Sequence, residues 1–147
     1  MQDIDLKWME EALKEAETAF ADGEIPVGAV IVANNRIIGR GHNMTQALND
    51  VTAHAEMIAI TAAEDFIGKY LEDCTLYVTV EPCLMCAGAI GWAQIKRIVI
   101  GTLDQKRGFS HFMKPGVTTF HPKATVTTGV KEEECRRLMT DFFASRR

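Results

Sequence analysis

Two short segments constrain the fold of this chain more than any other feature. The first reads His54-Ala55-Glu56, and the second, which begins at Pro82, reads Pro-Cys-Leu-Met-Cys and places cysteines at 83 and 86. An imidazole and two thiolates supply three tetrahedral ligands for a zinc ion, and a fourth position left to water distinguishes catalytic zinc from structural zinc. A fold that uses these residues together must bring both segments to one place.

Glu56 lies two positions beyond His54, which is unusual spacing for two side chains of one site. Zinc lowers the pKa of a bound water to about 7, and a nearby carboxylate can take the proton and return it to a leaving nitrogen. Within a helix, residues two apart point to nearly opposite sides, so these side chains can share a pocket only at a helix start. Asn49, Asp50 and Thr52 precede the apolar run and offer capping oxygens.

Cys83 and Cys86 follow a β-rich run at residues 75–80. Pro82 suits the first turn of a helix, because its missing amide hydrogen costs nothing there. Both thiols are then expected in the first turn, where the positive end of the helix dipole favours thiolate. We therefore predict that two helix N-termini face each other and assemble the site.

Cys-x-x-Cys motifs also occur in redox pairs and in structural zinc sites. A redox pair requires a thioredoxin-like context, which is missing from this sequence. A structural site requires a fourth protein ligand, and the candidates are Cys74, Cys135, His42, His111 and His121. The two cysteines lie alone in apolar or helical runs, which is typical of buried free thiols, and the histidines fit loops or the surface. The combination of His-x-Glu with Pro-Cys-x-x-Cys is instead the signature of zinc-dependent nucleobase deaminases.

Length and cysteine usage limit the class of protein. A chain of 147 residues can bury a single core, so we expect residues 1–147 to form a single zinc-dependent deaminase domain. Only four cysteines are present, and we recognise neither a signal peptide nor an apolar run near ~18 residues. We therefore expect a cytoplasmic protein with no membrane partner.

The net charge of −4 conceals a split along the chain. Residues 1–95 contain 5 basic and 15 acidic residues, a balance of −10, whereas residues 96–147 contain 11 basic and 5 acidic residues, a balance of +6. Such asymmetry is typical of a protein that docks one face on nucleic acid, although basic residues on a solvated helix and loop would produce the same count.

Residue patterning predicts alternating helices and strands. Apolar residues at helical spacing, β-branched runs and Gly or Asn turns indicate helices over 3–21, 53–66, 83–93 and 131–145, and strands over 25–32, 36–41, 75–80, 97–101 and 124–128. The segment 102–123 shows little periodicity. This order predicts an α/β fold with three layers, in which helices cover both faces of a central mixed five-stranded sheet.

With these residues placed, the chain resembles the cytidine deaminase-like zinc deaminases, and most closely the bacterial tRNA-specific adenosine deaminases. The resemblance covers nearly the whole length and is most specific at residues 24–29, 41–43, 49–56 and 77–89. It implies hydrolytic conversion of adenosine to inosine at the wobble position of a tRNA anticodon. It also implies one Zn²⁺ per subunit and a homodimer that contacts the tRNA anticodon loop.

The resemblance also implies roles for individual residues. It makes His54, Cys83 and Cys86 the zinc ligands and Glu56 the general acid/base. The target base would contact Asn43 and the backbone N–H of Ala55, in a pocket lined by Val27 and Pro26, and Asp104 would lie near the flanking nucleotide. In the C-terminal helix, the residues that would contact the anticodon loop are Phe142, Phe143 and Arg146. Adjacent helical residues diverge by about a quarter turn, so we expect one of the two phenylalanines to belong to the core. Trp92 and Met85 are assigned to the core or the dimer interface.

The segment 104–112 departs from the family pattern. Family members commonly carry a Gly- and Ser-rich stretch here, whereas this chain reads Asp-Gln-Lys-Arg-Gly-Phe-Ser-His-Phe. This departure indicates either a different grip on the anticodon loop or a smaller substrate. Two rival functions stay open. One is a free nucleobase or nucleoside deaminase that acts on guanine or cytosine, and the other is a non-catalytic RNA-binding module that zinc stabilises.

Overall fold

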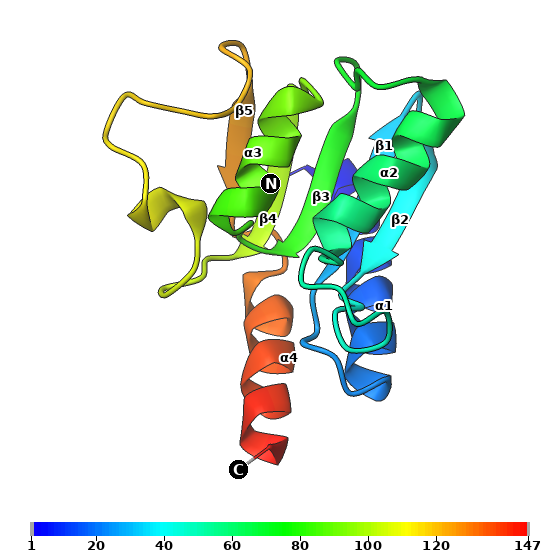
Figure 1. The fold of residues 1–147 in the computed structure, drawn as a ribbon, viewed down its shortest axis with the longest axis vertical. Helices are drawn as coiled ribbons and strands as arrows, with labels where there is room; N and C mark the ends of the chain where they lie inside the picture. Colours follow the sequence, from blue (N-terminus) through cyan, green and yellow to red (C-terminus); the bar gives the residue numbers. More distant parts are fainter. Residues whose placement is uncertain (1, 147) are drawn as a thin grey trace.

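A five-stranded mixed sheet forms the centre of the computed structural model, which describes residues 2–146 (Figure 1). The strand order is β2-β1-β3-β4-β5, with β1 antiparallel to β2 and β3, and with β3, β4 and β5 parallel. The strands are β1 (Gly28–Ala33), β2 (Arg36–His42), β3 (Thr75–Val80), β4 (Arg97–Thr102) and β5 (Thr125–Thr128). The predicted mixed five-stranded sheet is confirmed.

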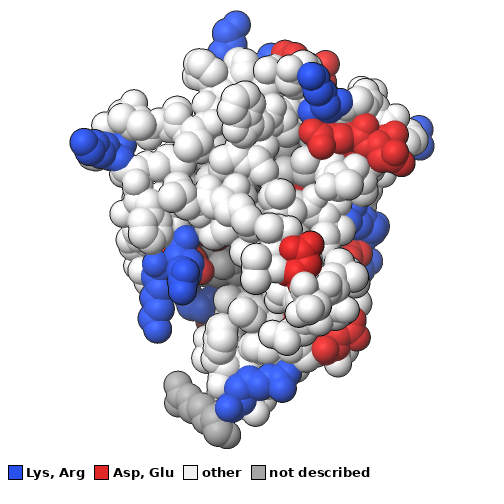
Figure 2. All heavy atoms as spheres, viewed as in Figure 1, with Lys and Arg blue, Asp and Glu red and all other residues white. Residues whose placement is uncertain are grey.

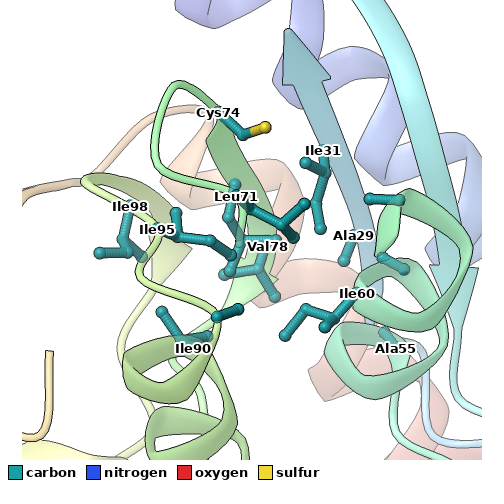
Figure 3. Close-up of a cluster of buried hydrophobic side chains, with 14 of the residues drawn as sticks. Ala29, Ile31, Ala55, Ile60, Leu71, Cys74, Val78, Ile90, Ile95 and Ile98 are labelled. Atoms are coloured by element: carbon teal, nitrogen blue, oxygen red, sulfur yellow. The ribbon is translucent and has the colours of Figure 1, made fainter. Parts of the chain in front are cut away.

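Four helices complete the three layers. The helices are α1 (Asp3–Ala21), α2 (Ala55–Ile67), α3 (Leu84–Trp92) and α4 (Glu132–Ser145). In β1, Ala29 and Ile31 pack with residues of α2 and α3 on one face (Figure 3). Val30 and Val32 pack with residues of α1 on the other face. This alternation follows the period of two in a strand and confirms the predicted placement of helices on both faces.

The carboxyl ends of β3 and β4 lie at one edge of the sheet, next to the first turns of α2 and α3 (Figure 1). α4 projects beyond the same edge (Figure 1). In open α/β sheets, ligands bind outside the carboxyl ends of the parallel strands. The topology therefore gathers both metal-binding segments, the irregular segment after β4 and the C-terminal helix at the edge where a ligand is expected.

Several element boundaries differ from the prediction, each for a local reason. The first strand begins at Gly28 and not at 25, because the N–H of Val27 donates to the carbonyl of Ile25 (2.8 Å) and closes a tight turn around Pro26. α2 begins at Ala55 and not at 53. The predicted capping oxygens are wrong, because Asp50 accepts the N–H and hydroxyl of Thr52 in its own turn, at 2.8 and 2.7 Å.

The turns and irregular segments otherwise follow the sequence. Asn34 and Asn35 both have positive φ, 52° and 60°, as a two-residue hairpin turn requires. The segment 103–124 contains a short 3₁₀ helix at Phe109–His111 and no strand among the described residues. Within residues 2–146, no helix is long and apolar enough to cross a membrane.

Candidate active site

The structure brings His54, Cys83 and Cys86 together across the sheet edge. His54 and Cys83 are the residues immediately before the first turns of α2 and α3, and both have extended backbone (ψ 156° and 172°). Nδ1 of His54 lies 3.6 Å from Sγ of Cys83 and 3.5 Å from Sγ of Cys86. Two helix starts therefore face each other, as the sequence predicts.

These distances fit a tetrahedral zinc ion. With Zn–N of about 2.0 Å and Zn–S of about 2.3 Å, two tetrahedral ligands lie roughly 3.5 Å apart. Residues 2–146 contain no other group of three or more His, Cys, Asp or Glu ligands that are close enough to hold a metal. No fourth protein ligand joins the three, so the geometry is that of an open zinc site and not of a closed structural one.

Other hydrogen bonds occupy the three histidines that were candidate fourth ligands. Nδ1 of His121 accepts the N–H of Lys123 (3.0 Å). Nδ1 of His42 lies 3.1 Å from a carboxylate oxygen of Glu15, and Nε2 of His111 lies 3.1 Å from the carbonyl of Asp104. Cys74 and Cys135 are buried in the two hydrophobic clusters on opposite faces of the sheet. These five side chains lie outside the metal group.

Hydrogen bonding within the group sets the protonation of the ligands. The thiol of Cys86 and the ring of His54 stabilise the Cys83 thiolate and lower the pKa of Cys83 to about 4. The same contacts raise the pKa of His54 and of Cys86. The group therefore holds one thiolate ready at neutral pH, which a cation requires of its sulfur ligands.

Glu56 lies in the first turn of α2, beside the metal ligands and almost fully buried. Burial raises the pKa of its carboxyl to about 7. A group with a pKa near the working pH can both accept and donate a proton. The start of α2 thus allows His54 and Glu56 to share one site despite their spacing of two residues.

A cavity of about 950 Å³ opens over this group. Its floor includes His54, Ala55, Glu56 and Cys83. Its walls include Ile25 and Val27 with Asn43 and Thr45, Val80 and Glu81 at the end of β3, Met85, residues 102–107, and one side of α4. Figure 2 shows Lys and Arg side chains beside a hollow on this side of the molecule. The cavity volume lies within the range of roughly 300–1,000 Å³ that small-molecule pockets span.

Asn43 contributes an unusual atom to the wall. The residue is buried at 6% exposure, and its Oδ1 is the one buried side-chain polar atom of residues 2–146 without a hydrogen-bond partner. Its backbone N–H donates to the carbonyl of Val27 (3.2 Å), which fixes the residue against the neighbouring wall. An unpaired buried acceptor is costly, and a donor from a bound ligand would remove that cost.

The wall from α4 was only partly found by sequence reasoning. Arg136, Met139, Thr140 and Phe143 all line the cavity, and their spacing of three, four and seven residues is that of one helix face. Because this spacing can be read from the sequence, Arg136, Met139 and Thr140 could have been predicted to share the cavity-facing side of α4 with Phe143. Arg136 also pairs with Glu132 and Glu133 in the first turn of the same helix.

Three predicted substrate contacts lie outside the cavity lining. Pro26 is buried between Ile25 and Val27, and the turn directs those two neighbours toward the cavity instead. Phe142 is buried against Phe20, with ring centroids 5.7 Å apart. The guanidinium of Arg146 lies over the Phe142 ring, 4.7 Å from its centroid.

Two further residues escaped sequence reasoning because their partners are distant in the chain. Glu24 accepts the N–H groups of Gln46 and Ala47 at 3.1 and 2.8 Å, and Glu81 accepts those of Asp104 and Ser110 at 3.1 and 2.9 Å. Both glutamates are almost fully buried. Asp104 itself lines the cavity, but one of its oxygens accepts the N–H groups of residues 106 and 107.

Comparison with known proteins agrees with this site. Residues 2–102 match the family described as the cytidine and deoxycytidylate deaminase zinc-binding region. The match contains all three metal-group residues and Glu56. The chain therefore belongs to this family of zinc-dependent deaminases.

Several tRNA deaminases are similar to this chain. A tRNA-specific adenosine deaminase of Bacillus subtilis is 43% identical over 139 residues, which cover 92% of this chain and 86% of the relative. A solved structure from a study of A-to-I editing by tRNA:A34 deaminases has a TM-score of 0.81 and 41% identity, and covers 90% of this chain and 98% of that one. The resemblance stated from the sequence is thereby confirmed.

A more distant likeness concerns the fold alone. A structure of guanine deaminase from Nitrosomonas europaea aligns with a TM-score of 0.77 at 22% identity, over 95% of this chain and 84% of that one. One fold thus occurs in proteins named for different bases, so the substrate must be argued from the cavity and not from the sheet.

Proposed function

We propose that this protein converts adenosine to inosine at the wobble position of a tRNA anticodon. The observation that carries the proposal is the cavity over Glu56, whose walls include the exposed ring of Phe143 and the basic residues Lys106, Arg107 and Arg136. Aromatic rings and basic groups around a protonable carboxyl suit a base presented on an RNA loop. The names of the relatives support the same substrate.

In this proposal, His54, Cys83 and Cys86 hold zinc, which supplies a hydroxide nucleophile at neutral pH when bound. The Glu56 carboxyl takes the proton of the attacking water and passes it to the amino group on C6 of adenine, which leaves as ammonia. Asn43 Oδ1 and the N–H of Ala55 orient the base. Water is consumed, ammonia is released, and inosine remains in the RNA.

The experiment is an incubation of the zinc-containing protein with an anticodon stem-loop that carries adenosine at the wobble position. Sequencing then reports inosine as A read as G, and we expect conversion at that position. Glu56→Ala is the matched control, because it should retain zinc and fold yet lose turnover. Ammonia release from free guanine or cytosine, without conversion of RNA, would select the free-base alternative.

We also propose that the protein is a homodimer joined through α3. No charged residue occurs in Leu84–Trp92, and three of its large side chains are exposed: Leu84 at 45%, Met85 at 39% and Trp92 at 85%. The surface over this helix is correspondingly free of charge in Figure 2. Leu84, Gly88 and Trp92 repeat every four residues and form one apolar face that a second copy can cover.

Light scattering tests the dimer. We expect twice the chain mass for the native protein and the monomer mass for Trp92→Glu, which places a charge on the apolar face. A native protein that is monomeric at micromolar concentration would refute this part of the proposal. The expected cytoplasmic location stays a prediction that rests on cysteine usage.

A further inference from the structure

Glu81 connects the metal-binding turn to the segment 104–110. It follows β3 directly, lies two residues before Cys83, and is 4% exposed. Its Oε1 accepts the N–H of Asp104 (3.1 Å), and its Oε2 accepts the N–H of Ser110 (2.9 Å). Because each carboxylate oxygen accepts one of these two backbone N–H groups, one side chain fixes both ends of this segment.

Gly108 provides independent evidence for the same contact. Its φ of −59° is open to any residue, so backbone conformation does not explain the glycine. A Cβ at this position would instead overlap the Glu81 carboxylate. Gly108 also pairs with Cys83 in an isolated β-bridge, and Phe109 donates its N–H to the carbonyl of Pro82 (2.9 Å). The middle of the segment is thus pressed onto the metal-binding turn.

The segment that Glu81 holds is one wall of the cavity. Residues 104–107 line it and carry the basic side chains of Lys106 and Arg107. Both carboxylate oxygens of Glu81 are engaged by backbone amides, whereas Glu56 is the acid placed to move protons. The two buried glutamates therefore have different roles: Glu81 holds the backbone of the segment, and Glu56 is placed for proton transfer.

We propose that Glu81 is a positioning residue, which fixes residues 104–110 as a wall of the substrate cavity and thereby sets substrate affinity, with no part in proton transfer. The choice of RNA as the substrate in its test rests on the proposed function. The bracing itself is independent of that choice, because it consists of contacts within the chain.

Glu81→Gln tests the proposal with little change in size. The amide retains one acceptor oxygen and places an NH₂ group against a backbone N–H that needs an acceptor. We expect amide hydrogen exchange at Asp104 and Ser110, followed by NMR, to become at least about tenfold faster, as local opening requires. We further expect KM for the anticodon stem-loop to rise about fivefold or more, with kcat changed less than about twofold and zinc content unchanged.

Asp5→Asn is the matched control, because it also neutralises a buried carboxylate but lies on the opposite face of the sheet. It should leave exchange at the two amides and KM unchanged. Gly108→Ala displaces the same segment without altering Glu81, and it should raise KM in the same direction. The double variant should be no worse than the larger single effect, since both changes act on one contact.

Unchanged exchange and unchanged KM in Glu81→Gln would overturn the proposal, and so would a loss confined to kcat. If Glu81→Gln does not fold, Gly108→Ala undergoes the same two measurements and decides in its place. If the native protein converts no RNA, the proposed substrate is refuted, and the exchange rates at Asp104 and Ser110 still decide whether Glu81 braces the wall.

Discussion

Phe142 and Phe143 pack edge to face with their ring centroids 5.4 Å apart, yet they belong to different environments. Phe142 is 5% exposed and contacts Phe20 of α1, whereas Phe143 is 47% exposed and lines the cavity. The buried ring anchors the end of α4 and thereby holds the exposed ring at the cavity.

The two rings therefore predict separable effects on substitution. Phe143→Ala should weaken binding of the stem-loop by about 1–3 kcal/mol, the contribution of one stacked base, with little change in the free energy of unfolding. Phe142→Ala should lower the free energy of unfolding by about 3–5 kcal/mol, as for other buried aromatic truncations. Binding of a fluorescently labelled stem-loop measures the affinity of both variants, and urea denaturation measures their free energy of unfolding. Equal losses of stability in the two variants would contradict this prediction.

Asn43 predicts a loss of function without a loss of stability. Asn43→Ala removes an acceptor that has no partner in the protein, so the free energy of unfolding should not fall. If the substrate satisfies that acceptor, kcat/KM should drop about tenfold or more, because one hydrogen bond contributes about 0.5–1.5 kcal/mol and correct placement of the base adds to it. Full activity in this variant would assign Asn43 to the scaffold.

The metal group predicts which cysteines matter for zinc. Cys83→Ala should reduce zinc, measured by elemental analysis, from one per chain to a small fraction, and it should abolish deamination. Cys74→Ala is the matched control, because Cys74 is equally a free thiol but lies in the core away from the site. Chelation of the native protein should remove activity and lower the melting temperature, since an ion bound only to the folded state stabilises it.

The ion pair of Asp5 and Arg97 predicts how stability changes with pH. The guanidinium donates to both carboxylate oxygens, at 2.8 and 2.6 Å, and the Tyr77 hydroxyl donates to one of them at 2.8 Å. Arg97, through its side-chain hydrogen bonds, holds the pKa of Asp5 below its ordinary value of 3.8. A lowered carboxyl pKa contributes stability that is complete above the unfolded-state pKa and is lost as the pH falls through the folded-state pKa.

Asp5→Asn should therefore lower the free energy of unfolding at pH 7 by about 1–3 kcal/mol, because it leaves the buried Tyr77 hydroxyl and the partly buried Arg97 guanidinium without their charged acceptor. The difference between native protein and variant should shrink as the pH falls below about 4. Urea denaturation at several pH values measures this difference. A difference that stays constant down to pH 2 would show that the ion pair is not its source.

The sequence predicted the metal group because its chemistry is local. His54, Glu56, Cys83 and Cys86 each depend on a helix start. Pro82 and the preceding strand indicate the start of α3, and the spacing of two between His54 and Glu56 indicates the start of α2. The capping prediction at Asp50 failed because a short polar side chain can bond its own turn as readily as a helix. The two helix starts could therefore be predicted from neighbouring residues alone, without knowledge of contacts between distant parts of the chain.

The bracing of the walls could not be predicted in this way. Glu81 meets partners 23 and 29 residues away in a segment without periodicity, and Glu24 meets partners 22 and 23 residues away. A quarter turn between Phe142 and Phe143 indicated that one ring is buried, but only the position of α1 decides which one. These outcomes depend on tertiary packing, which local patterns do not encode.

Glu24 and Glu81 accept hydrogen bonds from main-chain amides, so they hold the course of the two loops whatever side chains the loops carry. Residues such as Gln105, Lys106 and Arg107 can then be exchanged without moving the backbone that presents them. The scaffold thereby separates the shape of the cavity from its chemical selectivity. A new preference for the bases beside the target would require changes at a few exposed positions only, while the metal group and both glutamates stay as they are.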